Sequence, residues 1–316
     1  MAVSKLNAML VAHKSTVFLL GMVLSIVLAR ESLAALFIAG FAQAQNSHVL
    51  IVLPVVISLL WLESKSRYAN VSPAPRQGGL LLLSSVAISA FSWHYSHSLN
   101  PSYGLTLHVF ALVVAWIGLI VTCYGIATLR QHSFALAFLF LLVPIPNTIL
   151  DRLTYFLQYT STLVTHALFV IAGVPVTRDG FVLSLPTIEI EVAAQCSGIR
   201  SSMMLFLTTL VLAHLFLRSL WRQALLFVSV VAITIFKNAL RIFTLSTLAV
   251  YVDPVWLDGD LHHRYGGSVF FALAICLILA LLRALRRSEH PKMPLHAESR
   301  GDLGSSTFVP GDVSSR

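Results

Sequence analysis

The chain is a succession of apolar runs, most of them long enough to cross a lipid bilayer as a helix. A span of about 20 apolar residues matches the hydrocarbon thickness of a membrane. Inside lipid the backbone must satisfy its own hydrogen bonds, which favours helices. Only 11% of the 316 residues are charged, against 57% that are apolar, so the chain is too poor in charge to cover a water-facing surface. The sequence predicts an all-α, polytopic membrane protein.

We expect a bundle of about eight transmembrane helices with both ends in the cytoplasm. Basic residues mark the cytoplasmic loops of membrane proteins, and Arg76, Arg130 and Arg218 follow the second, fourth and sixth apolar runs. The transmembrane domain is expected over 1–287, and 288–316 as a disordered cytoplasmic tail. The expected spans are 17–38, 49–62, 79–93, 105–127, 134–150, 199–217, 223–250 and 265–285.

Two segments between the fifth and sixth spans do not look like simple crossings. Residues 151–173 are apolar but interrupted by polar side chains, so we expect them to lie along the outer interface or to re-enter it; a full crossing is the alternative. Residues 178–180 (Arg-Asp-Gly) signal a turn, with strands expected over 181–185 and 187–192. The second strand alternates polar and apolar residues. A short extracytoplasmic β-hairpin is therefore predicted directly before Cys196.

Cys196 lies where the predicted hairpin gives way to the sixth span. Ser197 is a suitable N-cap, and the positive end of a helix dipole favours thiolate over thiol. Arg200 adds positive charge one turn further. This setting suits a nucleophilic cysteine, and the alternative is an inert cysteine at a helix cap. Cys123 and Cys276 lie within apolar spans, where a cysteine acts as a small hydrophobic side chain.

Arg241 lies near the outer end of the seventh span, on the same side as Cys196. At about 1.5 Å per residue it is about 27 Å from Gln223, in a hydrocarbon layer of about 30 Å. Asn238 lies one turn earlier on the same face. The alternative is an arginine that snorkels to the lipid headgroups. Of the basic residues in this span, Lys237 is predicted to be the snorkelling one.

Two adjacent histidines, His262 and His263, open the eighth span on the same side. A histidine titrates near neutral pH and can serve as a base or an acid; the alternative is a polar interfacial loop. Gly266 and Gly267 follow, and their plainer role is close helix packing. Since the last three spans alternate in direction, the cysteine, arginine and histidine motifs are expected at one membrane face.

Together these motifs resemble those of the exosortase/archaeosortase family. The likeness covers about 134–285 and rests on 194–199 (Ala-Gln-Cys-Ser-Gly-Ile), on 238–242 (Asn-Ala-Leu-Arg-Ile) and on a His-x-x-x-Gly-x-x-x-Phe pattern. Both histidines fit that pattern, with a slight preference for His263. The resemblance implies a cysteine transpeptidase in the bacterial inner membrane, with its active site at the periplasmic face. Its partners would be exported proteins that carry a C-terminal sorting signal of the PEP-CTERM kind, and the family is associated with exopolysaccharide production.

The resemblance also implies a role for each motif. Cys196 would attack the scissile carbonyl and form a thioester, and Arg241 would stabilise the thiolate or the oxyanion. His263 or His262 would protonate the leaving amine and later activate an acceptor, whose identity is left open. No metal or cofactor is implied. The residues expected to support these groups are Ser197, Gly198, Asn238, Gly266 and Gly267.

Other functions compete with this interpretation. An intramembrane protease with water as acceptor would use the same residues. A small-solute transporter would have inverted repeats, or broken helices with polar groups near the midplane. An enzyme acting on lipid-linked glycans would favour an acidic pair, for which Asp258 and Asp260 are the candidates. The net charge of +8 does not indicate nucleic-acid binding, because no basic stripe with interleaved aromatic residues is present.

Overall fold

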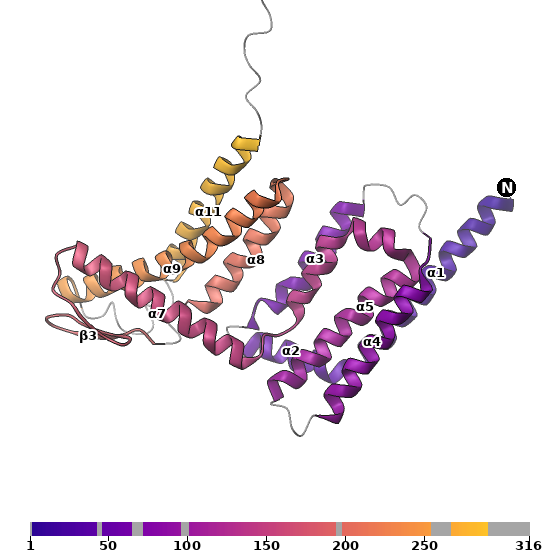
Figure 1. The fold of residues 1–316 in the computed structure, drawn as a ribbon, viewed down its shortest axis with the longest axis horizontal. Coiled ribbons are helices and arrows are strands. Elements are labelled where there is room, and N and C mark those ends of the chain that lie inside the picture. The colour runs from indigo at the N-terminus through magenta and orange to yellow at the C-terminus, as the bar shows by residue number, and fades with distance from the viewer. Residues whose placement is uncertain are drawn as a thin grey trace, which may run out of the picture.

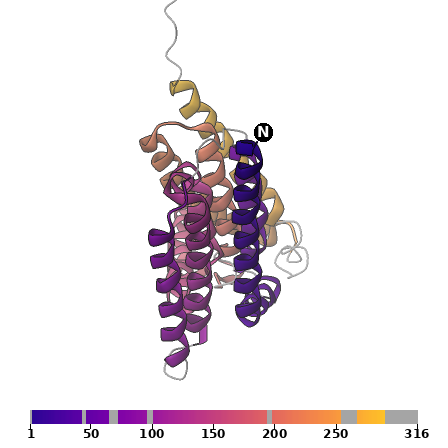
Figure 2. The ribbon, with the colours of Figure 1, turned by 90° about the vertical axis from the view of Figure 1, so that its right-hand side faces the viewer.

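The computed structural model describes residues 2–42, 46–64, 72–95, 101–193, 198–253 and 267–289. Within these ranges four helices are long and apolar enough to cross a membrane. They are α5 (Pro101–Gln131), α8 (Ile199–Phe216), α9 (Leu220–Tyr251) and α11 (Gly267–Glu289). Figure 2 shows the long helices side by side, running in roughly one direction. The chain is therefore an all-α, multi-pass membrane protein, as the sequence predicts.

Within the described residues, fewer spans are found than the eight that we expect from the sequence. Two further spans are present if each of two bent helix pairs counts as one, which gives six at most by length and composition. Helix α3 (Val49–Ser64) is apolar but short. Helix α4 (Pro75–His94) matches the third expected span in position. Its mean hydropathy is lower than that of the four spanning helices, since it contains glycine, serine and glutamine. The prediction of eight spans is not confirmed.

The first bent pair replaces the straight span expected over 17–38. Helix α1 (Ala2–Leu28) and helix α2 (Arg30–Ala42) meet at an angle of 70°. Beside the bend, the Ser25 hydroxyl donates to the Met22 carbonyl and accepts a hydrogen bond of 2.9 Å from Trp116 Nε1 of α5. A side chain bonded to the helix backbone in this way is a common companion of a kink.

The second bent pair replaces the fifth expected span. Helix α6 (Ser133–Phe138) continues as the 3-10 helix η2 (Leu139–Leu142) and stops before Pro144 and Pro146. Proline lacks the N–H that a helix needs and restricts the residue before it. The chain then turns by 95° into α7 (Asn147–Ile171). Residues 151–173 thus form most of one helix set across the direction of α6, an arrangement compatible with the interfacial placement expected for them.

Helices α4 and α5 pack closely because small residues line their contact. A methyl group at Gly78 would lie 2.1 Å from Thr122 Oγ1, and one at Gly118 would lie 3.1 Å from Leu81 Cβ. Small residues let helix backbones approach closely inside a membrane, where dispersion replaces the hydrophobic effect as the driving force. Around this pair, α3 and η2 complete a core that includes Val52, Val113 and Leu139.

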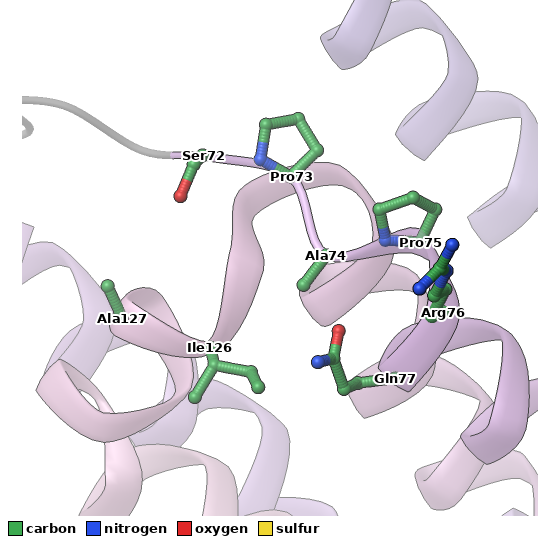
Figure 3. Close-up of a pocket in the computed structure, with 8 residues that line it drawn as sticks. All are labelled: Ser72, Pro73, Ala74, Pro75, Arg76, Gln77, Ile126 and Ala127. Atoms are coloured by element: carbon green, nitrogen blue, oxygen red, sulfur yellow. The ribbon is translucent and has the colours of Figure 1, made fainter.

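The end of α5 is kinked where it meets the chain entering α4. Gly125 has φ +84°, and an added Cβ would lie 2.0 Å from the Ser72 carbonyl oxygen, so only glycine fits. The carbonyl of Val121 accepts a hydrogen bond from the Ala74 N–H at 3.3 Å. Figure 3 shows the shallow pocket that results, lined by residues 72–77 together with Ile126 and Ala127.

In the C-terminal half, helix α9 lies between its neighbours α7, α8 and α11 (Figure 1). Leu205 of α8, Leu226 of α9 and Ala274 of α11 belong to one buried apolar cluster. Nearer the end of α9, Ile242 packs with Phe169 of α7 and with the sheet that follows α7. Helix α9 is therefore the element through which the last helices and the sheet are held together.

The sheet has three short antiparallel strands in the order β1-β2-β3. These are β1 (Thr177–Asp179), β2 (Val182–Ser184) and β3 (Glu189–Glu191). In the register, Leu183 pairs with Ile190 and both are buried towards α7 and α9, while the flanking glutamates of β3 are exposed. The alternation in 187–192 thus corresponds to β3, and β1 adds a strand that the sequence analysis did not predict.

Contacts between helix ends gather several of the basic loops at one end of the bundle. Arg222 Nη1, at the start of α9, lies 3.3 Å from Glu289 Oε1 at the end of α11. His214, near the end of α8, lies 3.4 Å from Glu63 of α3, which also binds His132 between α5 and α6. This is the end expected in the cytoplasm, and α8 begins at the opposite end with Gly198.

Candidate active site

The polar centre of the C-terminal half is a short stretch of α9 that includes two of the predicted residues. Asn238 is 1% exposed and Lys237 is 4% exposed, in a helix that is otherwise largely apolar. Arg241 follows one turn later and is half-buried, with its Nε shielded from solvent. Lying 21 residues after Leu220, Arg241 is about 32 Å along the helix, which places it towards the end at which α8 begins.

Gly198 forms the N-cap of α8 in the left-handed conformation, with φ +71° and ψ +17°. The prediction that Ser197 is the N-cap is wrong, because the N-cap is the next residue, Gly198, and the helix begins at Ile199. Ser197 itself lies outside the described residues. The hydroxyls of Ser201 and Ser202 both donate to the Gly198 carbonyl, at 2.9 and 2.7 Å. The first turn of α8 is thus tied to the residue that follows the Cys-Ser pair.

Asn238 and Gly198 are in direct contact. A methyl group at Gly198 would lie 3.2 Å from Asn238 Oδ1 and 3.4 Å from its Cγ, which is tighter than most real contacts of this kind. Glycine is therefore favoured at 198 both by its backbone conformation and by the side chain packed on it. This contact brings the segment that follows Cys196 against the helix face one turn before Arg241.

Lys237 bonds to the same turn of α8. The prediction that it snorkels to the lipid headgroups is wrong. Its Nζ donates a hydrogen bond of 2.5 Å to Ser201 Oγ. A lysine that reaches for headgroups keeps its charged end in water, whereas this side chain is almost fully buried. The sequence showed a lysine in an apolar span but could not show that a serine on the preceding helix faces it.

A stripe of buried polar residues on α7 faces α9 and the chain that leads to Cys196. Gln158 Nε2 donates to the Val192 carbonyl at 2.5 Å, and Thr165 Oγ1 donates to the Ala239 carbonyl of α9 at 3.3 Å. Ser161 and Thr162 complete the stripe at helical spacing and are fully buried. In the sequence Gln158 is one of the polar side chains that interrupt residues 151–173, and its partner is the backbone four residues before the cysteine.

The segment that carries Cys196 is therefore held on both sides. Before the cysteine, the Val192 carbonyl accepts a hydrogen bond from Gln158 of α7. After it, Gly198 packs against Asn238 and its carbonyl accepts a hydrogen bond from Ser201. Cys196, Ser197, His262, His263 and Gly266 all lie outside the described residues, as do Asp258 and Asp260. The predicted residues that the structure describes are thus Gly198, Asn238, Arg241 and Gly267.

Gly267 begins α11. Among the residues that the structure describes, none comes within 4 Å of a methyl group added there, so close packing against them is not the reason for this glycine. The two other cysteines are free and lie inside helices, Cys123 buried on α5 and Cys276 exposed on the face of α11. A cysteine facing apolar neighbours or lipid is expected to be inert.

The electrostatics of the described part of the site favour an anion. Lys237 and Arg241 lie one helical turn apart on α9, and Arg200 is exposed in the first turn of α8. None of the ion pairs within the described residues involves Lys237. Cations in a poorly solvated site lower the free energy of a nearby negative charge, such as a thiolate or an oxyanion.

The apolar helices identify a multi-pass membrane protein. Its candidate site is the buried polar cluster of α9 beside the N-terminus of α8. The family model for transmembrane exosortases matches residues 41–280, which is most of the chain and contains the cysteine, arginine and histidine motifs. The chain belongs to the transmembrane exosortase family. A search of the curated proteins and a search of the solved structures each found no significant match.

Proposed function

We propose that the protein is a membrane-embedded cysteine transpeptidase that cleaves the C-terminal sorting signals of exported proteins at the outer face of the bacterial inner membrane. The observation that carries the proposal is the contact between Gly198 and Asn238. It joins the cysteine motif and the arginine motif, which are at least 39 residues apart in sequence, at the same end of adjacent helices. Family membership supplies the class of reaction.

Cys196 is the proposed nucleophile. Its thiolate attacks the carbonyl carbon of the scissile peptide bond and forms a tetrahedral intermediate with a negatively charged oxygen. When the intermediate collapses, the carbon–nitrogen bond breaks and the new amine takes a proton. The product is a thioester between Cys196 and the new C-terminus of the substrate. The two restrained ends of the cysteine segment support this role, because a nucleophile must be held in place.

Arg241 is the proposed electrostatic partner of this chemistry. Its guanidinium is permanently charged and carries several donors in a rigid plane. It lies one turn beyond Asn238 and is half-buried, so its charge is less screened than at an exposed position. Stabilisation of the developing oxyanion by such a donor is a large term in acyl transfer.

His263 or His262 is the proposed acid and base. Protonated, the histidine gives its proton to the leaving amine; neutral, it accepts a proton from the acceptor that attacks the thioester. The acceptor then bonds to the carbonyl carbon and the Cys196 thiolate leaves. Water as acceptor would make the protein a plain protease that uses the same residues.

The transport alternative receives less support. The structure contains two bent helix pairs, which a transporter could use, but the buried Lys237 and Asn238 stand on the unbroken α9. Most of the buried polar groups of the C-terminal half lie on α7 and α9, and among them Lys237 and Gln158 bond to the start of α8 and to the Val192 carbonyl.

The experiment that tests the proposal follows an exported reporter protein that ends in a sorting signal. Cys196→Ala is expected to abolish the shortening of the reporter while the variant still accumulates in the membrane, and Cys123→Ser, as the matched control, is expected to leave it unchanged. Continued processing by Cys196→Ala would refute the assignment. The mass of the new C-terminus separates transfer from hydrolysis, since only transfer leaves an acceptor attached.

A further inference from the structure

We propose that Lys237 is a positioning residue of this active site: through Ser201 it fixes the turn that follows Cys196, and its charge favours the thiolate form of that cysteine. This inference rests on the proposed function. It concerns a residue outside the cysteine, arginine and histidine motifs that the family resemblance assigns.

A chain of two hydrogen bonds connects Lys237 to the cysteine segment. Lys237 Nζ donates to Ser201 Oγ at 2.5 Å, and the same hydroxyl donates to the Gly198 carbonyl at 2.9 Å. An ammonium bonded to a hydroxyl oxygen strengthens the bond that the hydroxyl donates in turn. Lys237 therefore holds the carbonyl of Gly198, two residues after Cys196, in a fixed orientation.

The burial of Lys237 is costly and calls for a compensating interaction. A charged side chain inside a membrane protein is destabilising unless it is paired or hydrogen-bonded, and most such residues are functional. Lys237 is 4% exposed, and within the described residues its ammonium donates a hydrogen bond to the Ser201 hydroxyl. A neutral hydroxyl compensates a buried cation only in part, so this ammonium would stabilise a negative charge that forms in the same site, as the thiolate of the proposed mechanism does.

Among the charged groups that the structure describes near this end of the bundle, the buried and half-buried ones are cations and the carboxylates are exposed. Arg241 lies on the same helix, Arg200 is exposed on α8, and residues 267–282 of α11 contain no charged side chain. His166 on α7 is half-buried beside the polar stripe, and the carboxylates of Glu189 and Glu191 on β3 are exposed to solvent. Because exposed carboxylates are well screened, they compensate the buried ammonium poorly.

The test is the pH dependence of the alkylation rate of Cys196, measured on the full-length protein in membranes with Cys123 and Cys276 changed to serine. Lys237→Gln keeps a donor for Ser201 but removes the charge, so the midpoint of the rate profile should rise by about one pH unit, a tenfold slower reaction at neutral pH. Lys237→Arg should restore most of the parental profile. Thr234→Val is the matched control, because Thr234 is buried one turn earlier on α9 and its hydroxyl has no partner among the described residues.

An unchanged midpoint in Lys237→Gln, with reporter processing lowered, would overturn the proposal and leave Lys237 a purely structural residue. Failure of the proposed function has a different signature. In that case the parent itself shows the midpoint of an ordinary thiol, about 8.5, and Cys196→Ala still processes the reporter. If Lys237→Gln does not accumulate in the membrane, Lys237→Arg is compared with the parent: a midpoint displaced by about one pH unit, although the charge is kept, contradicts the role of the charge.

Discussion

Asn238 packs against Gly198 so closely that a methyl group at the glycine would lie 3.2 Å from Asn238 Oδ1. The two residues belong to separate motifs: Gly198 lies two residues after Cys196, and Asn238 lies one turn before Arg241. Their contact is the point at which α8 and α9 are fixed relative to each other at this end of the bundle. The geometry of the proposed site therefore depends on it.

Gly198→Ala is expected to damage both stability and activity. The left-handed backbone costs an alanine about 1 kcal/mol, and the added methyl group pushes Asn238 away. Gly173→Ala is the matched control, because Gly173 also has a positive φ of +73° but nothing within 4 Å of an added Cβ. Thermal unfolding in detergent should show a loss for both variants that is larger in Gly198→Ala, and reporter processing should fall only in Gly198→Ala. Equal processing by the two variants would argue against the contact.

Asn238→Ala is expected to compensate in part for Gly198→Ala. Removing the side chain oxygen opens the space that the methyl group needs, so the two changes should not be additive. A double-mutant cycle on the unfolding free energy should give a coupling of about 0.5–2 kcal/mol. A coupling near zero would mean that the contact contributes little to stability.

Gln158→Leu is expected to loosen the other side of the cysteine segment. The change leaves the buried Val192 carbonyl without the donor it has at 2.5 Å, which costs about 1–3 kcal/mol. Reporter processing should fall together with the unfolding temperature. Thr160→Ala, at a half-buried position outside the buried polar stripe of the same helix, should change stability by less than about 0.5 kcal/mol. Normal processing by Gln158→Leu would show that the Val192 bond is dispensable for the site.

Arg241→Lys is expected to be a poor substitute for arginine. Lysine keeps the charge but not the planar set of donors, and loss of an oxyanion donor lowers the rate of acyl transfer about 100-fold or more. A time course of reporter processing in Arg241→Lys and Arg241→Ala should therefore show both far below the parent. Near-parental activity in Arg241→Lys would assign the residue to charge alone.

The sequence predicted the last helices well because their boundaries are local features. The sixth and seventh spans were expected over 199–217 and 223–250, and the structure has Ile199–Phe216 and Leu220–Tyr251. In each case an apolar run stops at polar or basic residues, a pattern that needs no knowledge of neighbouring helices. The strand expected over 187–192 rests on another local pattern, the alternation of polar and apolar residues, and β3 occupies Glu189–Glu191 within that range.

The burial of Lys237 and the bend between α1 and α2 could not be predicted in this way. Lys237 is buried because Ser201, on the preceding helix, accepts its hydrogen bond, and nothing in either local sequence reports that pairing. The bend lies between Leu28 and Arg30, shortly after Ser25, whose partner Trp116 lies on α5. Both depend on contacts between residues far apart in the chain.

The most direct test of the central claim is thiol labelling of Cys196 in right-side-out spheroplasts with a membrane-impermeant reagent, in a chain with Cys123 and Cys276 changed to serine. We predict fast labelling that slows sharply in Arg241→Ala, as expected for an activated thiolate at the outer face. Labelling that requires a permeant reagent would place the cysteine inside the cell, and labelling at the same rate in Arg241→Ala would remove the electrostatic partner; either result would contradict the proposed active site.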